Sequence, residues 1–219
     1  MKKTACITRK NRALRRVALV FLLLLLLWLT PFYHMTPGQV SRREAKDWML
    51  EDSVSILETR YLWEDGALRA LQLSAVGEDT LLVLSKWSFL GGWQLESASR
   101  AQPGNALDAG FLQCAHGDVE TNWSLLASFG RLRSPEITAL SFSAKASGVV
   151  DGVWTEGEYT RVDVDDGSFP TRDGERYFLQ FLPLEVGAGT LWDIRLDAQN
   201  NAGETLATRT SQEHWDFSW

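Results

Sequence analysis

The sequence predicts a mostly β protein: a single N-terminal transmembrane helix, a short amphipathic helix, and then an antiparallel, β-sandwich-like exported region. Three observations predict it. An apolar run follows a cluster of cations, one helix-start signal comes next, and short apolar segments separated by turn residues fill the remainder. We divide the chain into a basic tail (1–16), a membrane anchor (17–35), a stalk helix (36–53), a β-meander region (54–110) and a β-sandwich-like region (111–219).

The predicted anchor begins with thirteen residues that carry no polar side chain, VALVFLLLLLLWL at positions 17–29. Counting on through Tyr33 gives seventeen residues, which as a helix cover about 26 Å, near the lower limit for a bilayer core. Seven lysines and arginines precede the run, and no carboxylate does. The positive-inside bias therefore places the N-terminus in the cytoplasm and the rest of the chain outside.

A cleaved secretory signal is the alternative reading of the same run. Cleavage requires small residues shortly after the apolar stretch, whereas this chain continues with the bulky Phe32, Tyr33, His34 and Met35. We therefore predict a retained signal anchor, in a single-pass cell-membrane protein. Both readings export residues 36–219.

Charge and cysteine content limit the partners of the exported region. The chain has a net charge of −6 and residues 1–16 carry +7, so the remainder carries −13. A body this acidic repels nucleic acid, and it favours either basic partners or a simple solvating role for the charge. The anchor separates Cys6 from Cys114, so the two thiols cannot pair within one chain and stability must come from burial.

The first exported element is predicted to be a helix. Thr36 is a capping residue, Pro37 suits the first helical position, and Gln39 can reach back to the cap. In the sequence that follows, Ala45, Trp48 and Met49 share one face, and charged residues occupy most of the other.

From residue 54 onward the pattern changes to strands and turns. Glu64-Asp65-Gly66 and Gly77-Glu78-Asp79 are predicted to be tight turns of a meander, and the segment 99–110 a long loop or internal boundary. Eight further short strands at sandwich-like spacing indicate an all-β architecture. These strands are predicted at 111–114, 119–127, 137–144, 149–154, 159–164, 176–182, 190–198 and 204–210.

One acidic turn is a candidate calcium site. Asp163, Asp165 and Asp166 precede Gly167 and offer several of the oxygen ligands that Ca²⁺ requires. The spacing does not fit an EF-hand loop, and a solvated turn explains the same residues. Ca²⁺ is the one cofactor that the sequence suggests.

Tryptophan is abundant, with ten in the chain. Most are expected to be core residues, because tryptophan is largely buried in folded proteins. Trp215 and Trp219, in the terminal sequence HWDFSW, are the best candidates for exposed ligand contacts, such as a surface for a glycan or a partner protein.

The remaining polar groups do not form a recognisable catalytic set. Cys114 and His116 lack a third partner for nucleophilic or zinc chemistry, and Glu156 and Glu158 are one of many acidic pairs. We therefore predict binding or assembly at the cell envelope, with the membrane and an envelope protein or glycan as partners. Two alternatives remain: a cell-envelope glycan-processing hydrolase whose carboxylates converge only in the fold, and an accessory subunit of a membrane complex.

Overall fold

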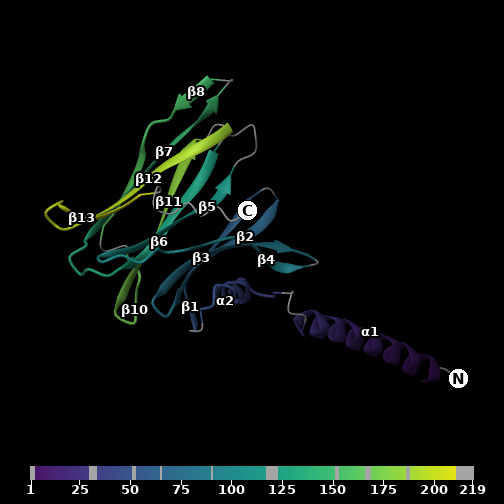
Figure 1. Ribbon diagram of the computed structural model, residues 1–219. Coiled ribbons are helices and arrows are strands. Elements are labelled where there is room, and N and C mark those ends of the chain that lie inside the picture. The colour runs from purple at the N-terminus through teal and green to yellow at the C-terminus, as the bar shows by residue number, and fades with distance from the viewer. Residues whose placement is uncertain are drawn as a thin grey trace.

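The structure, a computed structural model, describes residues 3–29, 34–50, 53–64, 66–89, 91–116, 123–150, 153–165, 169–185 and 188–210. Helix α1 (Lys3–Leu29) extends away from the body, and α2 (Pro37–Asp47) packs on it (Figure 1). Within these residues the strands form three antiparallel sheets. The prediction of a mostly β protein with helices at its N-terminal end is therefore confirmed.

The first sheet, which we call the meander sheet, has the strand order of the sequence. It contains β1 (Val54–Glu64), β2 (Ala67–Val76), β3 (Asp79–Ser88) and β4 (Gly92–Arg100). The tight turns predicted around Gly66 and Gly77 are present, and both glycines have the positive φ that such turns require. The predicted long loop is shorter than expected, because β4 continues to Arg100 and the next strand begins at Leu107.

The second sheet, the central sheet, has the order β10-β11-β6-β5. Its strands are β5 (Leu107–His116), β6 (Trp123–Leu132), β10 (Thr171–Arg172) and β11 (Glu175–Glu185). The third, the outer sheet, contains β7 (Ala139–Val150), β8 (Val153–Glu156), β9 (Thr160–Asp165), β12 (Ala188–Gln199) and β13 (Thr205–Thr210). The segment 149–154, predicted as one strand, is instead the hairpin between β7 and β8.

The sheets stack as three layers because the central sheet is apolar on both faces. One face packs on the outer sheet, through residues such as Phe178 and Leu182 against Phe142 and Ile194. The other face packs on the meander sheet in a core formed by Leu71, Leu73, Leu82, Leu84, Leu112, Ala127 and Phe129. The described strands therefore form a three-layer stack of sheets, one layer more than a two-sheet sandwich.

Helix α2 covers the outside of the meander sheet. Val40 packs against Ala70, Val83 and Trp93, and the Gln39 carboxamide accepts a hydrogen bond from the Thr36 N–H at 3.2 Å, as the capping pattern predicted. The predicted helical face was wrong at its end: α2 stops at Asp47, and Met49 is exposed with a φ of 58°.

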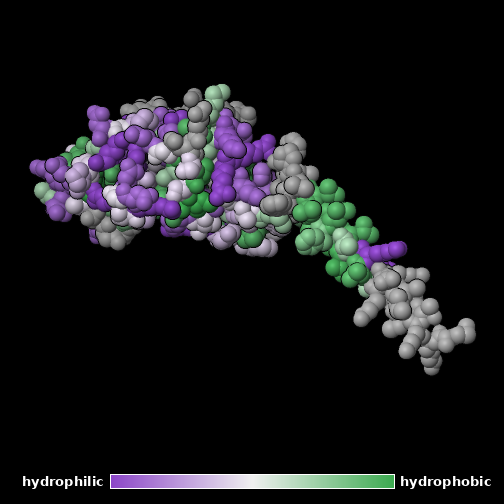
Figure 2. Space-filling view, turned by 90° about the horizontal axis from the view of Figure 1, so that it is seen from below, coloured by the Kyte–Doolittle hydropathy of each residue, from purple (hydrophilic) through white to green (hydrophobic). Residues whose placement is uncertain are grey.

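The described apolar side chains of helix α1 are exposed to solvent. Every side chain described between residues 13 and 26 is exposed, and Figure 2 shows the hydrophobic segment projecting from a largely hydrophilic body. Among the described residues, no helix combines the length and apolar composition needed to cross a membrane. The predicted transmembrane helix is not supported, since the thirteen apolar residues described in α1 cover only about 20 Å, and residues 30–33 lie outside the described ones.

Candidate functional site

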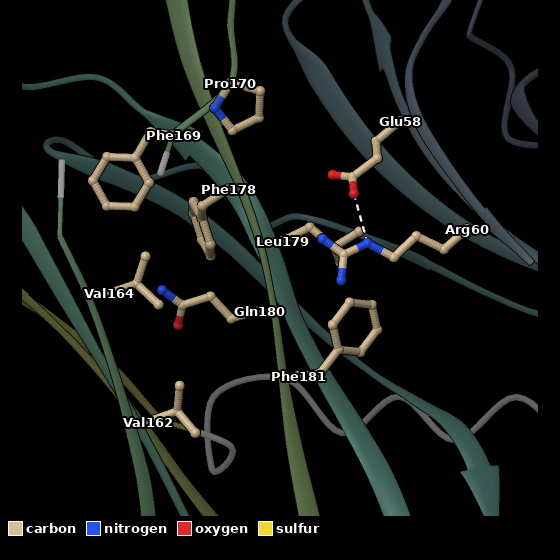
Figure 3. A pocket seen from close by; sticks show the side chains of 10 residues that line it. All are labelled: Glu58, Arg60, Val162, Val164, Phe169, Pro170, Phe178, Leu179, Gln180 and Phe181. Carbon is tan, nitrogen blue, oxygen red and sulfur yellow. Dashed lines mark hydrogen bonds and ion pairs between the residues drawn. The ribbon is translucent and has the colours of Figure 1, made fainter. Parts of the chain in front are cut away.

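A pocket opens where the edges of the three sheets meet. It has a volume of about 310 Å³ and lies between β1 of the meander sheet, β11 of the central sheet and β9 of the outer sheet (Figure 3). Most of its lining is apolar. The lining residues are Glu58, Arg60, Val162, Val164, Phe169, Pro170, Phe178, Leu179, Gln180 and Phe181.

Strand β11 positions the pocket because its side chains alternate between the two cores. Phe178 faces the outer sheet, whereas Leu179 and Phe181 pack toward the meander sheet. Figure 3 shows Phe178 and Gln180 on one side of the β11 ribbon and Phe181 on the other. The pocket therefore reaches around the edge of one strand.

Gln180 is the unusual residue of this pocket. Its side chain is 5% exposed and points toward Val162 and Val164 of β9 (Figure 3). Neither its Nε2 nor its Oε1 has a hydrogen-bond partner among the described residues. A buried polar group without a partner costs about 1–3 kcal/mol, so this carboxamide needs an explanation. A ligand that supplies both an acceptor and a donor would provide one.

The mouth of the pocket carries one ion pair. Arg60 Nε donates to Glu58 Oε1 at 2.6 Å, and the Arg60 guanidinium lies 4.7 Å from the centre of the Phe181 ring. This stacking holds Arg60 over the apolar lining. A register shift between Ile56 and Glu58 marks a β-bulge in β1 beside the pocket, a distortion that is frequent near functional sites.

The segment around β10 lies at one end of the pocket. Phe169 and Pro170 line the pocket just before β10. Arg172 Nη1 donates to the carbonyl oxygen of Ile56 at 2.9 Å, which joins β10 to β1. The pocket is therefore bounded by contacts between layers.

The chemistry of this lining suits binding. Among the described residues that line the pocket, the one carboxylate, Glu58, is already paired with Arg60, and none is a histidine, cysteine or serine. General acid–base or nucleophilic catalysis requires groups of those kinds within reach of one another. The pocket instead offers an apolar surface with one donor and acceptor pair, a common design for small recognition sites.

The predicted calcium ligands lie elsewhere on the same strand. Asp163 and Asp165 belong to β9 and are exposed, and Asp163 pairs with Arg161 at 2.7 Å. No group of three metal-ligating side chains is found in the part of the chain that the structure describes. Asp166 lies outside that part, so the Ca²⁺ site stays a prediction.

The tryptophans divide between core and surface. Trp93 is buried beneath α2 at 6% exposure, whereas Trp63 and Trp154 are 74% and 52% exposed. Trp63 and Trp154 are therefore exceptions to the expectation that the tryptophans are core residues. Trp215 and Trp219 lie outside the described residues, and their role as ligand contacts stays a prediction.

Cys114 is in the core between the central and meander sheets. Burial raises the pKa of its thiol to about 12, so the group is protonated at neutral pH and is a poor nucleophile. Glu156 and Glu158 are both exposed, outside any hollow described above. The side chain of His116, the other candidate beside Cys114, lies outside the described ones.

A second hollow of about 340 Å³ lies beside α2, between His34, Glu44 and Trp93. Desolvation raises the pKa of Glu44, and desolvation together with nearby Arg43 lowers the pKa of His34. Among the described residues, this hollow contains no buried side-chain polar atom without a hydrogen-bond partner. We therefore regard the pocket at β11 as the better candidate.

No protein family, curated protein or solved structure matches this chain.

Sequence reasoning missed this pocket, although one signal was present. In RYFLQFLPL, residues 176–184, every second residue from Phe178 onward is apolar except Gln180. A single polar residue on the buried face of a strand is a recognisable irregularity. Its meaning depends on β9 and on β1, which come from distant parts of the chain.

Proposed function

We propose that this chain is a non-catalytic binding or assembly protein, attached to a membrane by its N-terminal apolar segment, which binds a partner in the pocket between β1, β9 and β11. The observation that carries the binding role is the buried carboxamide of Gln180, which has no hydrogen-bond partner among the described residues. A ligand group that satisfies Gln180 recovers the cost of its burial, which makes binding both favourable and selective.

Two features support attachment to a membrane. The apolar side chains of α1 are exposed, with values such as 70% for Phe21, and seven cations precede them. An exposed apolar helix is costly in water, and the cations favour retention of the N-terminus on the cytoplasmic side. In this proposal the β body lies on the extracytoplasmic side.

The binding role is tested first by the stability of Gln180→Leu. If the carboxamide is kept for a ligand, leucine removes an unsatisfied group and fills the same space, so the free protein gains about 1 kcal/mol, or about 2–4 °C in melting temperature. Gln72→Leu is the matched control, because buried Gln72 accepts from Ser41 at 2.8 Å and donates to Thr59 at 3.0 Å.

We expect Gln72→Leu to lower the melting temperature, because it leaves Ser41 and Thr59 without their partner. A Gln180→Leu variant that is destabilised to the same degree would show that Gln180 is satisfied within the protein. The binding role of the pocket would then lose its support.

Membrane attachment is tested with intact cells that express the chain with a tag at each end. Added protease is expected to remove the C-terminal tag and leave the N-terminal tag, with the chain in the membrane fraction. The reverse pattern, or recovery of the whole chain without membranes, would contradict the proposed attachment. Neither result depends on the pocket.

A further inference from the structure

Among the described residues, β11 has no strand partner along one edge beyond Arg176. β11 pairs with β6 from Arg176 to Glu185, but with β10 only at Glu175 and Arg176. The Tyr177 N–H donates to the Pro170 carbonyl oxygen at 2.9 Å, so the backbone of Tyr177 points to the β10 side. Because the direction alternates along a strand and no register shift interrupts the β11–β6 pairing, the N–H and C=O groups of Leu179 and Phe181 point to that side too.

Pro183 supports this assignment of the free edge. It is two residues beyond Phe181, so its nitrogen also points away from β6. Proline has no N–H to donate, and within sheets it is tolerated where its nitrogen faces an unpaired edge. The free edge therefore extends over Leu179 and Phe181 and ends at Pro183.

This edge is recessed between two walls. Glu58 and Arg60 of β1 stand on one side, and Val162 and Val164 of β9 stand on the other (Figure 3). No strand of the part of the chain that the structure describes fills the space beside this edge, between the meander and outer sheets. The space is the pocket that contains the Gln180 carboxamide.

We propose that the ligand of this pocket is an extended peptide segment of a partner protein, which adds a strand to the central sheet by pairing with Leu179 and Phe181. This inference rests on the proposed binding function and names its ligand class. Strand addition supplies affinity through the backbone and specificity through pockets for alternate side chains. Both parts are present here, in the free edge and in the lining.

The lining specifies the side chains of the peptide. A residue that points toward the outer sheet meets Val162, Val164 and Phe178, with the Gln180 carboxamide among them. An amide- or hydroxyl-bearing side chain such as Asn or Thr satisfies Gln180 in that position. The chain after residue 16 carries a net charge of −13. Basic residues of the peptide on either side of its paired stretch are therefore attracted to the protein.

The strands on either side of the β11 edge favour a single peptide segment as the ligand over a second copy of this chain. Pairing of two β11 edges would bring β1 and β9 of one molecule against β1 and β9 of the other, because in each molecule the edge lies between these strands. A single extended segment has no flanking layers and meets no such obstacle.

The test begins with selection of random dodecapeptides displayed on phage against the full-length chain in detergent. The enriched peptide is synthesised, and its Kd is measured. We then methylate its backbone nitrogens one at a time. Strand pairing predicts a loss of tenfold or more at alternate residues of the paired stretch and little change at the residues between them.

Leu179→Pro and Leu179→Ala form a matched pair on the protein side. Both shorten the Leu179 side chain, but only proline removes the N–H at the free edge. Both variants keep the hydrogen bonds between β11 and β6, because the nitrogen of residue 179, like that of Pro183, points away from β6. We expect binding at least tenfold weaker in Leu179→Pro than in Leu179→Ala, with both variants folded by circular dichroism.

The outcomes separate this inference from the proposed function. Loss of binding in Gln180→Leu, without the alternating methylation pattern, would retain the pocket as the site but overturn strand pairing. Unchanged binding in Gln180→Leu would place the peptide elsewhere and overturn both. Selection that yields no peptide, or a chain that dimerises through β11, would overturn the peptide inference.

Discussion

At the scale of single residues, the most informative groups are polar side chains that the core encloses. The Gln180 carboxamide has no hydrogen-bond partner in the described part of the chain, whereas the Asp108 carboxylate has three. The Asp108 carboxylate accepts from Arg131 at 3.2 Å, from Arg133 at 2.7 Å and from the Gly104 N–H at 2.9 Å. The same kind of burial therefore produces a structural residue in one place and a candidate recognition residue in the other.

We expect Asp108→Ala to lower the free energy of unfolding by about 3 kcal/mol, because it leaves the buried Arg131 guanidinium with less compensating charge. Asp163→Ala, which breaks the exposed pair with Arg161, should cost less than about 1 kcal/mol. Urea unfolding of the two variants measures both values. Equal effects would contradict the assigned role of Asp108.

Cys114 allows a prediction about reactivity and pH. Because burial raises the pKa of its thiol to about 12, a thiol reagent at pH 8 should leave Cys114 unmodified in the folded protein and label it in urea. The Cys6→Ser variant isolates this signal. The pKa of the thiol rises from an ordinary value of 9.0 to about 12 in the folded protein, so burial of the protonated thiol contributes fully to stability below pH 9.0. That contribution is lost as the pH rises from 9.0 toward 12. Rapid labelling of the folded variant would contradict the burial of Cys114.

At the scale of elements, the close approach of β5 and β6 requires a glycine. A Cβ on Gly130 would overlap the Asp108 carbonyl oxygen, which belongs to the backbone of β5 and cannot rotate away. A similar contact links the segment before α2 to the meander sheet, where Gly92 lies against His34 and the Trp93 N–H donates to the His34 carbonyl oxygen at 2.8 Å. These glycines permit pairings that no other residue allows.

Gly130→Ala should therefore destabilise the protein by more than Gly203→Ala. Gly203 has a positive φ of 78° but open space around its Cβ position, so alanine there costs only about 1 kcal/mol of backbone strain. At Gly130 the strands must separate, and we expect at least about 2 kcal/mol. Thermal melting of the two variants compares them. A Gly130→Ala protein as stable as Gly203→Ala would show that β5 can move.

At the scale of the whole molecule, the central sheet shares a core with each neighbouring sheet. Leu71 and Leu82 of the meander sheet pack on it from one side, and Phe142 and Ile194 of the outer sheet from the other. Arg131 adds a polar link, since its Nη2 donates to the carbonyl oxygen of Glu78 between β2 and β3 at 2.8 Å. Separation of any one sheet from the stack would therefore expose apolar surface on a neighbouring sheet.

We therefore expect the body to unfold in one cooperative transition. In urea, tryptophan fluorescence and far-ultraviolet circular dichroism should give the same midpoint, because Trp93 in the meander sheet loses its environment together with the strands of the other sheets. Two separate transitions would contradict this prediction. They would instead favour independent units on either side of the predicted boundary at residue 110.

The sequence predicted the local features of this fold because they depend on neighbouring residues. Turn chemistry at Gly66 and Gly77 located the first hairpins, and the sequence TPGQ located the start of α2. It did not predict three layers, since a strand that is apolar on both faces resembles a buried strand of a sandwich. The predicted anchor included residues 30–33, which lie outside the described residues.

By itself, the sequence determined that this protein is largely β, that it is stabilised by burial and that an apolar segment precedes an acidic body. Only the tertiary structure decided that, within the residues it describes, Gln180 has no partner and β11 has an unpaired edge, and that β1 and β9 enclose both. The physical reason is distance along the chain. Arg60, Val162 and Gln180 are brought together by the packing of three sheets, and no local pattern records that packing.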